Sequence, residues 1–160
     1  MPYIENTDSF EKIILFDHLI YNADRNGCNL ILSSKKREKV LYAIDHTHVF
    51  KNQAIWDAAC LRRGMLEEDY YDNCIVERNV CYSLFGRRKA ISLKSLLEVA
   101  SEFESKINSS FIDEALSNLP SDWPIAEDSI EALREYLLYR AAHLRDMCRV
   151  IVRYKGWPNE

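Results

Sequence analysis

The sequence predicts a mainly α-helical domain that contains one small β-hairpin. Over most of the chain, apolar residues recur at spacings of three and four, which is typical of helices packed on a core. Two short apolar runs, Leu30–Leu32 and Val40–Ile44, flank a charged turn and indicate a pair of strands. The chain has 160 residues, of which 48% are hydrophobic and 29% charged, so we expect residues 1–160 to fold as a single domain.

The predicted helices combine apolar periodicity with polar residues that can cap their first turns. We expect helices over Ser9–Tyr21 with Asp8 or Ser9 as N-cap, Asn52–Arg63, Leu93–Lys106 with Ser92 as N-cap, Phe111–Asn118 with Ser110 as N-cap, and a long amphipathic helix from Ile125 or Asp128 to about Val152. The stretch from Gly64 to Arg88 has a weak pattern, which favours a mixture of short helices and loops.

Three oxygen-bearing side chains are predicted to meet at one end of the hairpin. Asp24 and Asn29 lie in the polar loop that leads into the first strand, and Asp45 follows the second strand. Because a hairpin brings the start of one strand beside the end of the other, Asn29 and Asp45 should be neighbours. The alternative for Asp24 and Asn29 is a local role in a capped turn between a helix and a strand.

Phosphoryl transfer is a reaction that uses such a set of side chains. The attacking hydroxyl needs a carboxylate to accept or orient its proton, and Mg²⁺ takes carboxylate and amide oxygens as ligands. Asp24 suits the first role, whereas Asn29 and Asp45 suit the second. We therefore expect Asp24 to be a catalytic base and Asn29 and Asp45 to be metal ligands.

Three segments of the chain resemble parts of known kinases. Residues 22–29, NADRNGCN, resemble the N-x-D-R-x-x-x-N catalytic loop of HipA-like kinases and of type II phosphatidylinositol kinases. Residues 41–50, LYAIDHTHVF, resemble the metal-binding I-D-H/N-x-x-x-F segment of the same group. Residues 115–123, ALSNLPSDW, resemble the tail of the HipA-like branch, which favours that branch over the lipid kinases.

This resemblance implies a fold, an activity and a set of ligands. The fold would be the C-terminal lobe of a protein-kinase-like enzyme, and the activity would be ATP-dependent transfer of a phosphoryl group to a protein serine or threonine. Mg²⁺ and ATP would be bound through Asn29 and Asp45, with Asp24 as the base. Arg25 would add a positive charge near the transferred phosphate.

The chain departs from that family in the part that holds the nucleotide. Such kinases carry, before the catalytic loop, an N-terminal lobe with a lysine and a loop that covers the phosphates. Here only a few residues precede the first predicted helix, and the chain has four glycines in all. His46 replaces the glycine that follows the metal-binding Asp of protein kinases, and Asn26 stands where a lysine is often found. We therefore expect a nucleotide-binding lobe or a regulatory protein as a partner.

Two functions of other classes are also compatible with the sequence. One is a non-catalytic protein-interaction module that binds a partner, or forms a homodimer, through apolar surface on the first helix and the hairpin. The other is a metal-dependent hydrolase that uses Asp24, Asn29 and Asp45. His46 and His48 beside Asp45 would suit a transition metal only if the second strand continued through them, and loop histidines are the simpler interpretation.

The composition argues against several other classes. A formal net charge of -4 gives no overall attraction to nucleic acid or to an anionic membrane surface. The five cysteines are scattered without a CxxC pair, which is typical of reduced thiols in the cytoplasm. The start MPYIENTDSFEK does not resemble a signal sequence, and no apolar run reaches about 18 residues. We therefore expect a cytoplasmic protein without membrane contact.

Overall fold

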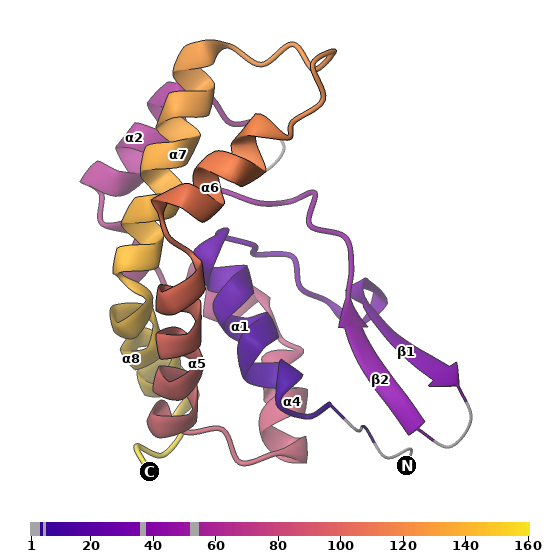
Figure 1. The fold of residues 1–160 in the computed structure, drawn as a ribbon. Helices are drawn as coiled ribbons and strands as arrows, with labels where there is room; N and C mark the ends of the chain where they lie inside the picture. Colours follow the sequence, from indigo (N-terminus) through magenta and orange to yellow (C-terminus); the bar gives the residue numbers. More distant parts are fainter. Residues whose placement is uncertain (1–3, 5, 36–37, 52–54) are drawn as a thin grey trace.

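The computed structural model describes residues 4, 6–35, 38–51 and 55–160, and this part of the chain is mainly helical with one two-stranded antiparallel hairpin (Figure 1). The predicted mixture of helices and a small hairpin is therefore confirmed. In chain order the elements are α1 (Ser9–Leu19), η1 (Gly27–Asn29), β1 (Leu30–Lys35), β2 (Glu38–Ala43), α2 (Ala58–Leu66), η2 (Asp69–Tyr71), α3 (Cys74–Arg78), α4 (Tyr82–Arg88), α5 (Leu93–Lys106), α6 (Ser109–Ser117), α7 (Glu127–Ala142) and α8 (Leu144–Lys155). None of the helices formed by these residues is long and apolar enough to cross a membrane.

Helix α1 is the element around which the main core forms. It packs against α5, α7 and α8, and its Phe10, Ile14 and Leu15 are almost completely buried together with Leu96 of α5 and Ile151 of α8. Burial on nearly all sides explains the mixed apolar spacing of α1, because an enclosed helix needs no polar face. Each of these side chains stabilises the fold by about 1.5–3 kcal/mol through the apolar surface it buries.

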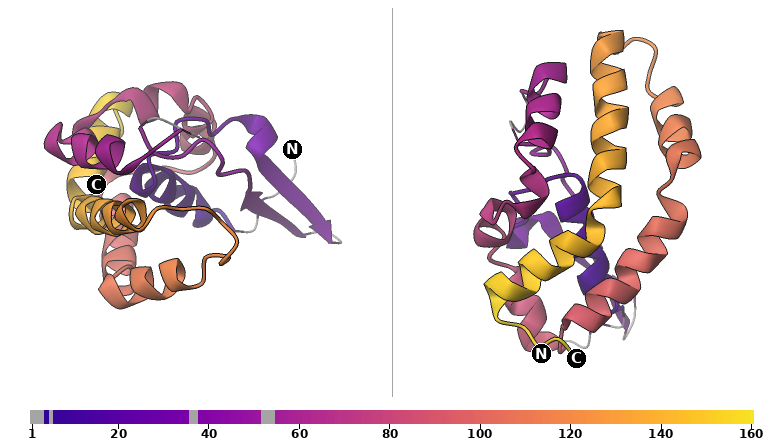
Figure 2. Two further views of the ribbon diagram at one scale, coloured as in Figure 1. Left: turned by 90° about the horizontal axis from the view of Figure 1, so that it is seen from above. Right: turned by 90° about the vertical axis from the view of Figure 1, so that its left-hand side faces the viewer.

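A second, smaller core lies between α2 and α7. Its buried residues include Phe50, Leu61 and Tyr136, and α6 also packs on α7. In the right-hand view of Figure 2, α7 runs upright between these neighbours, and the chain turns sharply where α8 begins. The hairpin projects to one side of the helices (Figure 1).

The turn between α7 and α8 differs from the prediction of one long helix in the C-terminal region. The two helices meet at His143, whose amide bonds the carbonyl of Arg140, three residues back instead of four. The His143 ring stacks on Tyr70, with 3.8 Å between the ring centroids. The apolar pattern runs through both helices, so periodicity alone did not indicate the break.

Helix α2 begins later than predicted, at Ala58. Asp57 caps it by accepting a hydrogen bond from the Cys60 amide at 2.7 Å. The predicted start, Asn52, lies outside the described residues. The weakly patterned stretch that ends at Arg88 forms short helices and loops, as predicted.

The residue that caps a helix was predicted correctly for α5 and wrongly for α6. Ser92 caps α5 as predicted, in a capping box with Ser95. Helix α6 is capped by Asn108 and not by Ser110, so it begins earlier than expected. Several polar residues stand in a row before α6, and the sequence does not say which of them adopts the extended backbone of a cap.

The hairpin forms from both predicted strands. Its register pairs Leu30 with Ala43 and Ile31 with Tyr42. Because side chains alternate along a strand, Leu30 and Ala43 pack towards the helical core, whereas Ile31 and Tyr42 share the other face and are about half exposed. Tyr42 also lines a cavity between β2 and α1. Of the predicted charged turn, residues 36–37 lie outside the part of the chain that the structure describes.

His18 of α1 makes the stability of the core depend on pH. Its ring is buried, with Nδ1 2.8 Å from the carbonyl oxygen of Ile14, and Nε2 has no partner among the described residues. Burial lowers the pKa of His18 to about 3, and the charge of Arg140 acts in the same direction. The folded protein therefore holds this ring in its neutral form.

We expect the free energy of unfolding to fall as the pH drops from 6.5, the ordinary pKa of histidine, towards about 3. In this window the unfolded chain binds a proton that the folded chain excludes, so His18 contributes a loss of about 1.4 kcal/mol per pH unit. Urea denaturation at several pH values measures the slope. The variant His18→Leu should lack this contribution, and equal slopes in the two proteins would contradict the assignment.

Candidate active site

The loop that follows α1 is anchored from inside the fold. Asn22 is buried, and its side chain donates a hydrogen bond to Asp17 Oδ1 at 2.9 Å and accepts one from the Asp24 amide at 3.1 Å. Asn79 accepts a hydrogen bond from the Arg25 amide at 2.8 Å and donates one to the Asn22 carbonyl at 2.8 Å. These bonds fix the backbone on both sides of Asp24 without using its carboxylate.

The carboxylate of Asp24 faces solvent. Its side chain is 49% exposed, and it accepts no hydrogen bond from any residue that the structure describes. Nδ1 of His48 lies 3.8 Å from its Oδ2 atom. A carboxylate with free oxygens can accept a proton from an incoming hydroxyl, which is the role predicted for Asp24.

Asn29 and Asp45 lie at the same end of the hairpin, as predicted. The Asn29 carbonyl accepts a hydrogen bond from the Ile44 amide at 3.0 Å, and the Asn29 side chain donates one to the Asp24 carbonyl at 2.9 Å. Asp45 follows with a φ of 55°, a left-handed conformation that Asp and Asn tolerate better than most residues. The fold thus brings the backbones of the three predicted site residues together.

Thr47 holds the carboxylate of Asp45. Oδ1 of Asp45 accepts hydrogen bonds from the Thr47 hydroxyl at 2.7 Å and from the Thr47 amide at 3.3 Å. These two bonds lower the pKa of Asp45, the hydroxyl bond most strongly. Asp45 is therefore ionised at neutral pH, and its second carboxylate oxygen is left for a ligand.

The side chains of Asn29 and Asp45 offer oxygen atoms of the kind that Mg²⁺ prefers. Oδ2 of Asp45 and Oδ1 of Asn29 accept no hydrogen bond within the described part of the chain, and both are hard oxygen ligands. Mg²⁺ commonly binds one or two protein side chains and completes its shell with water and substrate phosphates, such as those of ATP. No cluster of three or more His, Cys, Asp or Glu side chains that could hold a metal occurs in residues 4, 6–35, 38–51 and 55–160.

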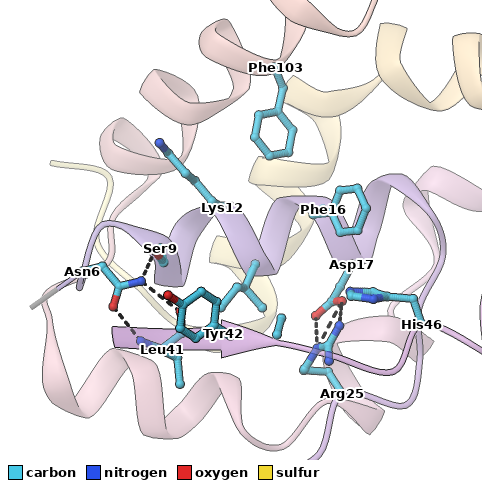
Figure 3. A pocket seen from close by; sticks show the side chains of 12 residues that line it. Asn6, Ser9, Lys12, Phe16, Asp17, Arg25, Leu41, Tyr42, His46 and Phe103 are labelled. Atoms are coloured by element: carbon cyan, nitrogen blue, oxygen red, sulfur yellow. Dashed lines mark hydrogen bonds and ion pairs between the residues drawn. The ribbon is translucent and has the colours of Figure 1, made fainter. Parts of the chain in front are cut away.

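The side chain of Arg25 does not lie where its predicted role as an exposed charge beside Asp24 would place it. Its side chain is completely buried, with Nε and Nη2 at 3.1 and 2.8 Å from the Asp17 carboxylate (Figure 3). Its Nη1 donates to the carbonyl oxygens of Asn29 at 3.0 Å and Ile44 at 2.6 Å. The guanidinium therefore points into the fold, where it joins α1 to the residues that flank the two strands, and not to the solvent-exposed side of the loop where the predicted role requires a charge.

Asp17 is the buried partner of Arg25, and the sequence did not single it out. Burial raises the pKa of Asp17, whereas hydrogen bonds from Arg25, Asn22 and Tyr82 act in the opposite direction. Because arginine keeps its proton in proteins, the two residues form a buried ion pair. One feature of the sequence could have indicated the buried role of Asp17, namely a carboxylate within a helix that is otherwise largely apolar.

A cavity of about 500 Å³, here called the α1–β2 cavity, lies between α1 and β2 (Figure 3). Its walls are mainly apolar, and Asp17, Arg25 and His46 lie at one end. His46 packs edge-on against Phe16, with 5.4 Å between the ring centroids. Burial lowers the pKa of His46, and the charge of Arg25 acts in the same direction. Asp24, Asn29 and Asp45 do not line this cavity.

Asp24 lines a second cavity, here called the Asp24 cavity, of about 420 Å³. The other lining residues are Ala23, His48 and Arg78. Arg78 was missed because it lies far along the chain, at the end of α3, in the weakly patterned stretch. Strand β2 ends before His46, and His46 and His48 line different cavities, which argues against a shared transition-metal site.

Comparisons with models of known protein families, with curated proteins and with solved structures found no match. The resemblance to kinases therefore depends on the short motifs of the sequence. The fold shows where each residue of these motifs lies. Asp24 is exposed and Arg25 is buried, and Asn29 bonds Ile44, the residue before Asp45.

We expect the variant Arg25→Met to destabilise the fold by about 3–5 kcal/mol. Removing the guanidinium leaves the buried Asp17 carboxylate without its charged partner and the Ile44 carbonyl without its Arg25 donor. The matched control is Arg62→Met, because the pair of Arg62 with Asp128 is exposed and should contribute at most about 1 kcal/mol. Urea denaturation measures both; similar losses in the two variants would contradict the structural role of Arg25.

Proposed function

We propose that this chain supplies the catalytic base and the magnesium ligands for ATP-dependent phosphoryl transfer to a protein serine or threonine. The observation that supports this most directly is the hydrogen-bonded unit of Asp24, Asn29 and Ile44. The Asn29 side chain bonds the backbone of Asp24, and the Asn29 backbone bonds that of Ile44, the residue before Asp45. One residue therefore fixes the spacing of a free carboxylate and a second acidic residue.

In this proposal each side chain has a separate task. Asp24 accepts the proton of the acceptor hydroxyl as the phosphoryl group is transferred. Oδ1 of Asn29 and Oδ2 of Asp45 hold the metal. When bound, Mg²⁺ neutralises charge on the phosphates and orients them for in-line attack. The positioning is done by buried groups, so the reacting carboxylate needs no internal partner of its own.

The rest of the nucleotide site would come from another lobe, supplied by a further part of the protein or by another chain. The outer face of the hairpin, formed by Ile31, Tyr42 and Ile44, supports this. These side chains are 47%, 52% and 39% exposed, which is unusual for adjacent large apolar groups on a folded domain. An apolar surface beside the polar end of the hairpin suits a nucleotide base or the lobe that encloses one.

We expect transfer from radiolabelled ATP in a mixture of this chain with the product of a neighbouring gene, and not with the chain alone. Asp24→Asn should lower the rate at least about a hundredfold, because a general base typically contributes that much. Asn29→Ala and Asp45→Asn should raise the Mg²⁺ concentration that transfer requires. Asp122→Asn is the matched control, since Asp122 is exposed and distant in sequence from the site.

The second candidate is a non-catalytic interaction module, and the exposed outer face of the hairpin favours it equally well. The two candidates differ in their need for the carboxylates. If Asp24→Asn and Asp45→Asn both leave every measurable function unchanged, the kinase proposal is wrong and the interaction module is the better explanation.

Both candidates predict that the outer face of the hairpin is covered by a partner or by a second copy of the chain. We expect Ile31→Ser combined with Tyr42→Ser to weaken that association about tenfold or more, because burial of each large apolar side chain contributes about 1.5–3 kcal/mol. Leu66→Ser is the control, since Leu66 is exposed at the end of α2. Sedimentation of the chain, alone and with the partner, measures the effect; unchanged association in the double variant would exclude this face.

A further inference from the structure

The Asp24 cavity combines the proposed base with a cation from a distant part of the chain. Asp24 comes from the loop after α1, His48 from the segment after β2, and Arg78 from the last residue of α3. The side chains of Asp24 and His48 are both about half exposed, so the cavity is open to an incoming molecule. Its lining is mostly polar, in contrast to that of the α1–β2 cavity.

Arg78 is the cation that lines the Asp24 cavity, and it has no carboxylate partner among the described residues. Six other arginines each form an ion pair: Arg25, Arg62, Arg134, Arg140, Arg145 and Arg149. Arg78 has no carboxylate within ion-pair distance among the described residues. A guanidinium binds carboxylates and phosphates through paired hydrogen bonds. Arg78 also hydrogen-bonds the side chain of Cys74, but its charge is not paired with a carboxylate of the described residues. The Asp24 cavity thus presents a cation that an incoming anion can pair with.

The position of the cavity favours the acceptor over the nucleotide as its occupant. Asn29 and Asp45, the proposed metal ligands, do not line it. A metal-bound nucleotide would lie at their end of the hairpin, whereas the Asp24 cavity reaches the same base from the side of His48 and Arg78. A hydroxyl in this cavity would lie against Asp24, His48 and Arg78 and not against the proposed metal ligands.

We propose that the Asp24 cavity is the acceptor site and that Arg78 selects a peptide hydroxyl flanked by an anionic group. The hydroxyl would lie at Asp24, and a carboxylate or phosphate on a neighbouring residue would pair with Arg78. This inference rests on the proposed kinase function, because it assigns the acceptor of that reaction. The negative net charge of the protein does not oppose it, since the contact is local and exposed charges further away are screened.

The test is a titration of the full chain, without nucleotide, followed by NMR. Three acetylated and amidated peptides carry a central serine flanked by aspartates, by asparagines or by phosphothreonine and alanine. The aspartate peptide should shift the signals of Asp24, His48 and Arg78 and bind at least about fivefold more tightly than the asparagine peptide. The phosphothreonine peptide shows whether phosphate or carboxylate is the preferred anion.

Variants of Arg78 test whether the anionic group of the peptide binds at this side chain. Arg78→Gln should weaken binding of the aspartate peptide about tenfold and remove its preference over the asparagine peptide. Arg78→Lys should keep part of the preference, because it keeps the charge but not the paired donors. Arg87→Gln is the control: Arg87 is exposed near the end of α4 and does not line the cavity.

Two results would overturn the inference: equal binding of the aspartate and asparagine peptides, or tight aspartate binding that survives Arg78→Gln. Its failure is distinguishable from failure of the kinase proposal. Phosphoryl transfer from ATP that depends on Asp24 but shows no preference for acidic peptides would contradict the acceptor assignment and leave the kinase proposal intact. If peptides bind at Arg78 but the mixture of this chain with its partner never transfers phosphate, the kinase proposal is wrong, and the assignment of an acceptor is wrong with it.

Discussion

The buried ion pair of Asp17 and Arg25 is the interaction on which the geometry of the site depends. Both side chains are fully buried, so the desolvation of two charges must be offset by good hydrogen bonds. Arg25 provides them in three directions: to Asp17 on α1, to Asn29 before β1, and to Ile44 after β2. One side chain therefore sets the angle between α1 and the hairpin. A non-polar substitute could fill the space, but it could neither pair with the Asp17 carboxylate nor donate to the Ile44 carbonyl.

A second buried pair holds α1 from the opposite side. Arg140 of α7 binds Asp69 at 2.5 Å and also donates to the carbonyls of His18 and Leu19. These carbonyls belong to the last turn of α1, whose acceptors have no partner within the helix. The end of α1, where the loop with Asp24 begins, is thus fixed by Arg140 from α7 and by Arg25 from the loop itself. Buried side chains provide the rigidity, and exposed ones are left free to react.

The sequence predicted the exposed part of this arrangement better than the buried part. The hairpin, and with it the meeting of Asn29 and Asp45, follows from local alternation and from the geometry of a tight turn. The burial of Arg25 does not, because Asp24 and Arg25 are adjacent polar residues in one loop, and only the distant Asp17 decides which of them turns inward. The same reason explains why Arg78 was missed: contacts across the fold leave no periodic signal.

The arrangement leaves the site open on one side. The inner face of the hairpin packs on the core, but Ile31, Tyr42 and Ile44 on the outer face are exposed near Asn29 and Asp45, the proposed metal ligands. A nucleotide site needs polar groups for the phosphates and an adjoining apolar surface for the base, and in the proposed function the partner lobe would complete both. The Asp24 cavity, in contrast, is formed by three segments of this chain alone. The chain would therefore recognise the acceptor by itself, whereas a partner lobe would complete the nucleotide side, and the two halves of the site could be lost or regulated independently.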